Sequence, residues 1–317
     1  MFKLSPLRIL ACVGLAIAMA PAAAQAQSFV YRGMCEASAA VAVGPDHFLV
    51  ADDNDSTLRL YARNDPKPVS ATDFSTALGV KPTTKTDIEG AASIGNRIYW
   101  ITSHGRHSSG EERPQRRRFF ATDVTGQGGS TKLTLAGKVY VGLVDDLLAE
   151  PALASYRLRE AAALAPEAEG GFNIEGLAAT PEGKLLIGFR NPIRDGKALV
   201  VPIDNPQELV QGARARFGKA IALALGGRGI RSIDRVGDAY LIVAGPFGEG
   251  SDFALYRWSS AAGDGPVRLP QIDLAGLHPE ALFAIPDTDL VQMLSDDGGC
   301  EDQAPADRKF RGIVVKP

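Results

Sequence analysis

The stretch Asn173-Ile174-Glu175-Gly176-Leu177 is followed by the apolar run 184–189 and then by the polar residues Arg190-Asn191-Pro192. Two short apolar segments separated by a turn and followed by a polar loop are typical of a β-hairpin. Related stretches recur along the chain. They begin at Cys35-Glu36-Ala37, Asp87-Ile88-Glu89-Gly90, Gly229-Ile230-Arg231-Ser232 and His278-Pro279-Glu280.

The spacing of these repeats predicts the fold. Positions 36, 89, 175, 231 and 280 are separated by 53, 86, 56 and 49 residues, and a propeller blade spans about 40–50 residues. The long interval contains residues 143–165, rich in helix-forming residues, which we interpret as a helical insertion. We predict an all-β, five-bladed β-propeller. Six blades, with a degenerate one in the long interval, and a β-sandwich are the alternatives.

The two ends of the chain are expected to close the ring. The last repeat supplies only three strands, ending at 310–315, while residues 28–31 have a strand pattern and no partner of their own. Pairing these two segments would remove an open sheet edge. Residues 27–317 should therefore form one domain.

Residues 1–26 have the pattern of a secretory signal peptide. Lys3 and Arg8 precede the apolar run 9–20, and Ala24-Gln25-Ala26 matches a signal-peptidase site. The apolar run is short for a membrane span, although an uncleaved anchor is an alternative. We expect a periplasmic or secreted protein with no membrane span after cleavage.

Cys35 and Cys300 remain after cleavage. Export permits a disulfide between them, which would join the two ends of the chain; two free thiols are the alternative. The 34 basic and 37 acidic residues give a net charge of −3, which disfavours a nucleic-acid partner. We expect a monomer.

Propeller geometry places a site at one mouth of the central channel. The first strand of each blade lines the channel, and its start lies on the same face as the loop between the second and third strands. Residues 36, 89, 175, 231 and 280 should therefore form a ring at this mouth. The candidate substrate-binding residues are Ser103, Arg190, Asn191, Arg231, Asp53 and Asp296.

The four glutamates of this ring are candidate metal ligands: Glu36, Glu89, Glu175 and Glu280. Carboxylates that converge in one channel repel one another unless they are protonated or bind a cation. Oxygen-only ligands favour Ca²⁺, and the chain has no zinc-binding pattern. Because Arg231 belongs to the ring, a network of salt bridges without any metal is the alternative.

The segment 103–118 holds two of the four histidines and five arginines. Arginine suits bidentate contacts to phosphate or carboxylate groups, and a histidine or a metal ion can activate water. We therefore take His104 and Arg106 as candidate catalytic residues. A solvated, mobile hairpin loop is the alternative interpretation of this segment.

Several of these motifs resemble those of an exported bacterial family known as a domain of unknown function, DUF3616. The shared stretches are 34–38 (Met-Cys-Glu-Ala-Ser), 87–90, 173–176 and 100–106. This resemblance implies a β-propeller without an established activity. The Glu-Gly motifs are also similar to those of esterase-like phytases and of calcium-activated nucleotidases, five-bladed propellers with a central Ca²⁺. The latter resemblance implies ligands at Glu89, Glu175 and Glu280, with Ser232 as a further candidate; Arg231 departs from the pattern.

Two functions are consistent with the sequence. The first is a metal-assisted hydrolase of a phosphorylated or other anionic ester, with Ca²⁺ in the ring and His104 and Arg106 near the substrate. The second is a non-catalytic propeller that binds a ligand or partner on the same face. They differ in whether His104 and Arg106 point into the channel mouth.

Overall fold

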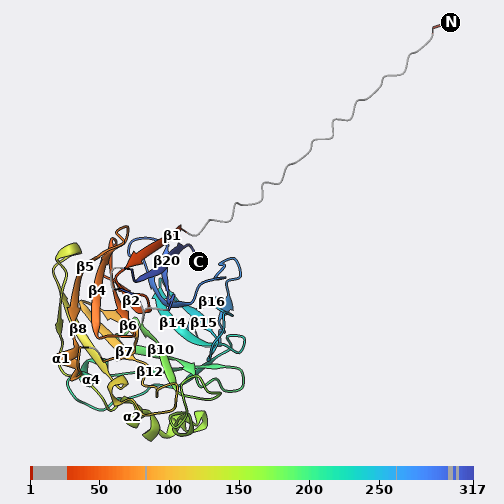
Figure 1. Ribbon diagram of the computed structural model, residues 1–317. Helices are drawn as coiled ribbons and strands as arrows, with labels where there is room; N and C mark the ends of the chain where they lie inside the picture. Colours follow the sequence, from red (N-terminus) through yellow and green to blue (C-terminus); the bar gives the residue numbers. More distant parts are fainter. Residues whose placement is uncertain (3–26, 83, 262, 299–302, 305–306) are drawn as a thin grey trace.

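The computed structural model describes residues 1–2, 27–82, 84–261, 263–298, 303–304 and 307–317. In these residues the strands form five four-stranded antiparallel sheets, which surround a central channel as the blades of a β-propeller (Figure 1). The predicted five-bladed fold is confirmed. In each blade the strands run from the channel to the outer edge in the order given below.

Blade 1 contains β2 (Ala37–Ala42), β3 (His47–Asp52), β4 (Thr57–Ala62) and β5 (Pro68–Asp73). Blade 2 contains β6 (Ile88–Ile94), β7 (Arg97–Thr102), β8 (Phe119–Thr125) and β9 (Lys132–Leu135). Blade 3 contains β10 (Asn173–Ala179), β11 (Leu185–Asn191), β12 (Ala198–Ile203) and β13 (Ile221–Leu223). Blade 4 contains β14 (Gly229–Val236), β15 (Ala239–Gly245), β16 (Ala254–Trp258) and β17 (Val267–Arg268). Blade 5 contains β18 (Pro279–Ala284), β19 (Val291–Ser295), β20 (Lys309–Val315) and β1 (Gln27–Arg32).

Blade 5 closes the ring with strands from both ends of the chain. β1 lies beside β20 (Figure 1) and pairs with it antiparallel. In this pairing Tyr31 lies opposite Phe310. The buried Tyr31 ring also contacts Phe48 of blade 1, with the ring centroids 5.2 Å apart. The predicted closure is confirmed, and aromatic packing extends it from blade 5 into blade 1.

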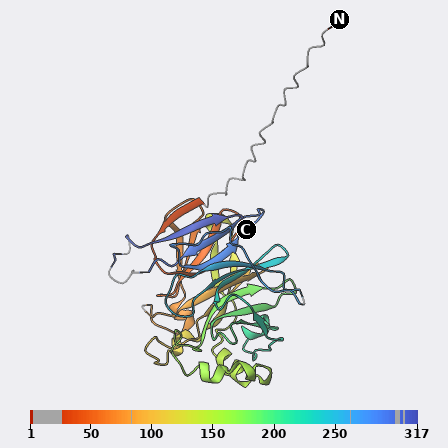
Figure 2. The ribbon, with the colours of Figure 1, turned by 90° about the vertical axis from the view of Figure 1, so that its right-hand side faces the viewer.

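The long interval between blades 2 and 3 holds α2 (Leu143–Ala149), the 3-10 helix η3 (Pro151–Tyr156) and α3 (Leu158–Ala161). The predicted helical insertion is confirmed. Its buried leucines pack in one cluster with residues of blades 2 and 3, at the lower edge of the molecule in Figure 2. The other short helices are α1 (Ser75–Leu78), α4 (Pro206–Leu209), η1 (Pro114–Arg116) and η2 (Gly128–Ser130).

The glycine after each of two ring glutamates allows neighbouring inner strands to approach. A Cβ atom on Gly90 would lie 2.8 Å from the Cβ of Leu177, and one on Gly176 would lie 2.8 Å from Cγ2 of Ile233. Both distances are too short for carbon atoms in contact. The Glu-Gly pairs in the sequence therefore reflect close packing of blades 2, 3 and 4 around the channel.

The proposed signal-peptide residues 3–26 and Cys300 lie outside the described residues. Cys35 is buried, and the backbone N–H of Asp297 donates to the Cys35 carbonyl at 3.4 Å. The chain therefore passes close to Cys35 three residues before Cys300, and the bridge stays a prediction. Within the described residues, no helix is long and apolar enough to cross a membrane.

Candidate functional site

Each inner strand begins with an irregularity that leaves one residue without a cross-strand partner. The skipped residues are Ser38, Glu89, Glu175, Arg231 and Glu280. A bulge of this kind redirects a side chain, and here it recurs at the same place in every blade. The prediction of Glu36 as the ring residue of blade 1 is wrong. The equivalent residue is Ser38, because equivalence in the ring follows the strand register and not the position of a glutamate.

One half of the ring is a buried network of arginines and glutamates. Arg231 Nε lies 3.0 Å from Glu175 Oε2, and the Arg231 guanidinium also pairs with Glu280. Arg190 Nη1 donates to Glu175 Oε1 at 3.0 Å, and Asn173 Nδ2 donates to the same oxygen at 2.9 Å. Burial lowers the pKa of Arg231, although Glu175 opposes this shift. Glu175 and Glu280 are therefore engaged in the salt-bridge network that the sequence offered as an alternative.

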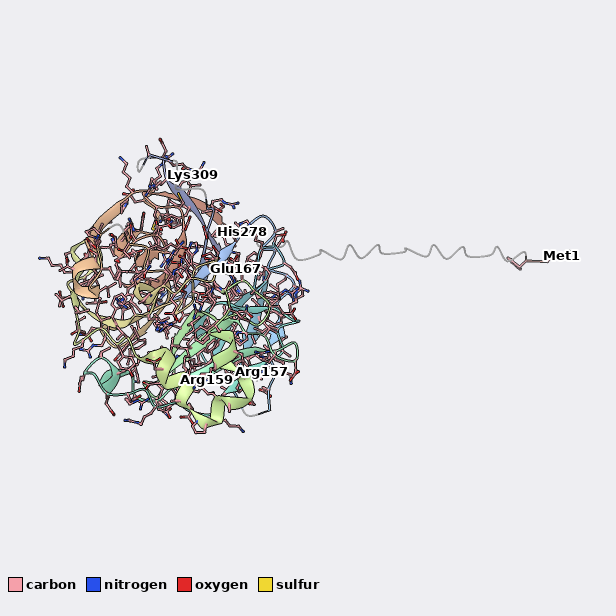
Figure 3. All side chains as sticks on the ribbon, turned by 60° about the horizontal axis from the view of Figure 1, so that its bottom comes forward. Met1, Arg157, Arg159, Glu167, His278 and Lys309 are labelled. Carbon is pink, nitrogen blue, oxygen red and sulfur yellow. The ribbon has the colours of Figure 1, made fainter. Side chains whose placement is uncertain are left out.

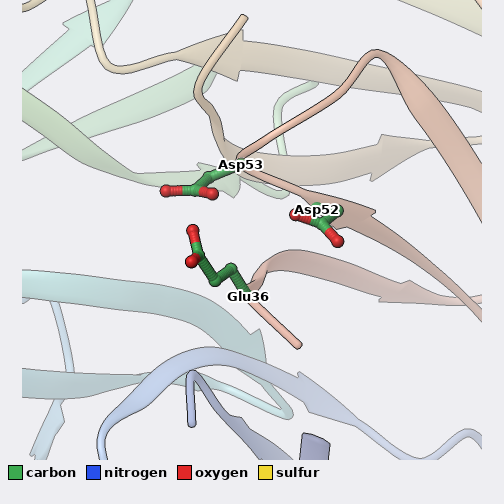
Figure 4. A group of neighbouring side chains, drawn as sticks. All are labelled: Glu36, Asp52 and Asp53. Atoms are coloured by element: carbon green, nitrogen blue, oxygen red, sulfur yellow. The ribbon is translucent and has the colours of Figure 1, made fainter. Parts of the chain in front are cut away.

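The other half of the mouth is rich in carboxylates. Lys85 Nζ lies 2.7 Å from Asp53 Oδ2 and 3.6 Å from Glu36 Oε2. Figure 4 shows the carboxylates of Glu36 and Asp53 facing one another, with Asp52 to one side. Asp87 pairs with Arg116 at 3.1 Å.

Burial and mutual repulsion raise several pKa values in this half. Burial raises the pKa of Glu89 well above its usual value, and the charges of Asp87 and Glu175 add to this shift. Burial likewise raises the pKa of Asp53, and it raises the pKa of Asp296 to about 6. A raised pKa means that the carboxylate takes up a proton more readily, and a cation bound nearby would oppose this shift.

Two connected cavities open above the ring. The first, of about 440 Å³, is bordered by Glu280 and Asp296, and the second, of about 460 Å³, by Lys85 and Arg116. Both are lined by Asp53, Glu89, Glu167 and Arg190, so we call them the first and second lobes of one mouth. Figure 3 shows Glu167 and His278 near the middle of the molecule, away from Arg157 and Arg159 on the helical insertion.

A larger groove of about 720 Å³ lies at the opposite ends of the inner hairpins. It is bordered by the turns between β2 and β3 and between β6 and β7. Its only titratable side chains are Asp46 and His47. The chemistry that the sequence predicts is therefore concentrated at the mouth with the two lobes.

The structure brings together only some of the predicted substrate-binding residues. Asp53, Arg190, Arg231 and Asp296 line the lobes. Ser103 and Asn191 are buried outside them: Ser103 Oγ accepts a hydrogen bond from the Gly105 amide, and Asn191 Nδ2 donates to the carbonyls of residues 166 and 168. These two residues support loops around the mouth.

The two candidate catalytic residues also lie outside the lobes. His104 is buried, and its Nδ1 donates to the Thr102 carbonyl at 2.7 Å. The Arg106 guanidinium binds the carbonyls of Ala162 and Gly110 and pairs with Glu112. Neither side chain points into the channel mouth, so neither is carried into the proposal below.

Sequence reasoning missed other residues of the mouth: Lys85, Asp87, Glu167, Arg113 and Arg116. Two of them come from the segment 103–118, which the sequence did select. Asp87 stands two residues before Glu89 in the Asp-Ile-Glu-Gly motif, as Asn173 stands before Glu175. Because both residues stand two positions before a ring glutamate, this position in the repeat could have identified Asp87 as a residue of the mouth.

We expect His104 to make the fold sensitive to acid. Burial lowers its pKa from 6.5 to about 4, so between these values the unfolded chain binds a proton that the folded chain does not. The resulting stability, up to about 3 kcal/mol, is complete above pH 6.5 and lost as the pH falls toward 4. Urea unfolding at pH 7, 6, 5 and 4.5 should show a shallower pH dependence for His104→Asn, which tolerates the left-handed backbone here. Equal pH dependence in both proteins would contradict this assignment.

The fold and the site define a five-bladed β-propeller with a polar, charged channel mouth. The chain belongs to the family described as "Protein of unknown function (DUF3616)", which matches residues 125–287, just over half of the sequence. No curated protein matches the chain.

Many solved structures are similar to this chain, among them the following two. Glutaminyl cyclase of Myxococcus xanthus is 15% identical, with a TM-score of 0.48 over 91% of this chain and 95% of that one. A protein of Thermus thermophilus described as a putative oxidoreductase (glucose dehydrogenase) is 14% identical, with a TM-score of 0.48 over 92% and 100%. At these scores the likenesses carry no argument about activity.

Proposed function

We propose that this chain is an exported, periplasmic or secreted propeller that binds a small phosphorylated or other anionic ester at the channel mouth and hydrolyses it with the help of a bound Ca²⁺. The observation that supports this function most strongly is the arrangement of charged side chains in the second lobe. There the cationic side chains of Lys85, Arg113 and Arg116 border the carboxylates of Asp53, Asp87 and Glu89.

The second lobe contains a cationic side chain for the anionic group of the ligand and carboxylates that would hold a metal ion. The Arg113 side chain is about one third exposed, and within the described part of the chain its guanidinium pairs with the exposed Glu111 alone. It is therefore available to an anion. Lys85 and Arg116 are already bound to carboxylates. A divalent cation among those carboxylates would make the lobe net positive, which would favour an anionic ligand.

Arg113→Met should weaken phosphate binding about tenfold or more, since a charged hydrogen bond contributes about 1.5–3 kcal/mol. Inorganic phosphate is the probe, titrated by calorimetry in the presence of Ca²⁺. Arg97→Met is the matched control, because Arg97 pairs with Asp123 at the start of β7, the end of the blade away from the mouth. Equal affinity in Arg113→Met and wild type would reject the anion site.

Hydrolysis is tested separately with p-nitrophenyl phosphate, bis-p-nitrophenyl phosphate and p-nitrophenyl acetate, each with Ca²⁺ and with EDTA. Calcium-dependent release of p-nitrophenol supports the hydrolase. Binding of phosphate without turnover of any ester favours the second candidate function, a non-catalytic ligand-binding propeller. The positions of His104 and Arg106 outside the lobes are the observation that favours that alternative.

A further inference from the structure

We propose that a divalent cation binds between Asp53, Asp87 and Glu89, at the junction of the two lobes. This proposal deepens the proposed function, on which it rests for the role of the ion. It differs from the ring of four glutamates expected from the sequence, because Glu175 and Glu280 are bound by arginines. Only Glu89 belongs to both sets.

The first argument is distance. Asp53, Asp87 and Glu89 each offer one carboxylate oxygen, and these atoms all lie within 4.8 Å of one another. Two oxygens bound to the same Ca²⁺ at about 2.4 Å can be no further apart than about 4.8 Å. The three carboxylates can therefore share one ion without movement of the strands.

The second argument is that Glu89 has no partner. Its side chain is only 7% exposed and lines both lobes. Among residues 27–82, 84–261 and 263–298, no hydrogen bond or ion pair reaches its carboxylate, whereas buried charges in proteins are normally paired or bind metals. Glu89 thus presents an unpaired, buried carboxylate to the junction.

The third argument comes from a neutral side chain nearby. Asn173 is 5% exposed and lines the second lobe together with the three carboxylates. Its Nδ2 donates to Glu175, but its buried Oδ1 has no partner within the described part of the chain. An amide oxygen is an ordinary ligand for Ca²⁺, and an unsatisfied one is costly without a ligand.

The charge of this half of the mouth fits a divalent ion. Immediately around the proposed ion, the carboxylates of Glu36, Asp53, Asp87 and Glu89 carry four negative charges, and the cations that pair with members of this group are Lys85 and Arg116. The difference is two negative charges. One divalent cation would balance it, and a set of oxygen ligands without nitrogen or sulfur favours Ca²⁺.

A second group of acids shares Asp53 but is less suited to an ion. Glu36, Asp52 and Asp53 also lie within reach of one another. In that group every carboxylate already has a partner, because Asp52 Oδ1 accepts the Asn54 amide at 3.0 Å and Lys85 pairs with both Glu36 and Asp53. The proposed group shares Lys85 but also contains Glu89, which has no partner among the described residues. We therefore infer that the ion binds on the Glu89 side of Asp53.

Calcium titration calorimetry of the full chain, freed of metal with EDTA and dialysed, tests the proposal. We expect one Ca²⁺ per chain in wild type and binding at least tenfold weaker in Glu89→Gln. Asp52→Asn is the matched control for the rival group and should bind within about threefold of wild type, since a tenfold change in affinity corresponds to about 1.4 kcal/mol. If Glu89→Gln does not fold, Asp87→Asn replaces it, because asparagine tolerates the left-handed backbone of Asp87.

Several results would overturn the proposal. They are no Ca²⁺ binding to wild type up to about 5 mM, unchanged affinity in both Glu89→Gln and Asp87→Asn, and a loss of affinity in Asp52→Asn alone. The same experiments distinguish failure of the ion site from failure of the proposed hydrolase. Ca²⁺ binding without ester hydrolysis supports the ion site and rejects the hydrolase. Hydrolysis that persists in EDTA, in a chain that binds no Ca²⁺, rejects the ion site and supports a hydrolase that works without it.

Discussion

Replacement of Glu175 by glutamine is expected to lower the free energy of unfolding by about 3–5 kcal/mol. The Glu175 carboxylate lies between Arg190 and Arg231, and both guanidinium groups are buried with it. Glutamine keeps the length of the side chain but removes its charge. Two buried arginines would then share the remaining carboxylates, and an uncompensated buried charge is costly.

The measurement is chemical unfolding at neutral pH, followed by thermal unfolding, where the melting temperature should fall by about 5–8 °C. Glu167→Gln is the matched control. Glu167 approaches the same Arg190 at 3.4 Å, but its side chain is 46% exposed, and exposed ion pairs contribute about 1 kcal/mol or less. If the two variants lose equal stability, the buried network does not stabilise the ring in the way argued here.

Replacement of Tyr31 by alanine should cost about 3–5 kcal/mol, because it removes a large buried ring where the propeller closes. The Tyr31 ring stacks on Phe310, with the centroids 5.1 Å apart, and contacts Tyr61 of blade 1. Its hydroxyl donates to the Arg63 carbonyl at 2.6 Å and accepts from Gln292 Nε2 at 2.9 Å. The substitution therefore weakens both β1 and the contact between blades 5 and 1.

Val30→Ala is the matched control on the same strand. Val30 is 42% exposed, and substitutions at such positions usually change stability by about 0.5 kcal/mol or less. Equilibrium unfolding in urea compares the two variants, and hydrogen exchange of β20 amides reports whether the closure opens locally. A small effect of Tyr31→Ala on both readouts would show that pairing of β1 with β20 alone suffices to close the ring.

The sequence by itself determined the architecture of this protein. The repeat of a short hairpin and a polar loop, spaced by about 50 residues, predicted five blades because each blade buries the same pattern of apolar strands. The strand pattern of residues 28–31, which has no partner nearby in the sequence, predicted the closure in blade 5. Residues 143–165 predicted the helical insertion from their helix-forming composition. These features depend on local patterns, which a sequence displays directly.

The composition of the site was only partly determined in this way. The sequence correctly placed Glu89, Glu175, Arg231 and Glu280 on one ring, because they occupy equivalent positions of the repeat. It misplaced the blade 1 equivalent, since Glu36 precedes the bulged residue Ser38 by two positions. A shift in register cannot be recognised from residue types alone.

Only the tertiary structure decided how the charged groups are partnered. Arg190 comes from the end of β11 and meets Glu175 across its own blade, while Arg231 reaches Glu175 from the next blade. Asn173, Asp87 and Glu89 come together from two blades without any regular spacing in the sequence. His104, although it lies in the histidine- and arginine-rich segment 103–118, is buried away from the mouth. Pairing, burial and the resulting pKa shifts depend on distances between segments that the repeat pattern does not encode, and these distances exist only once the blades have closed into a ring.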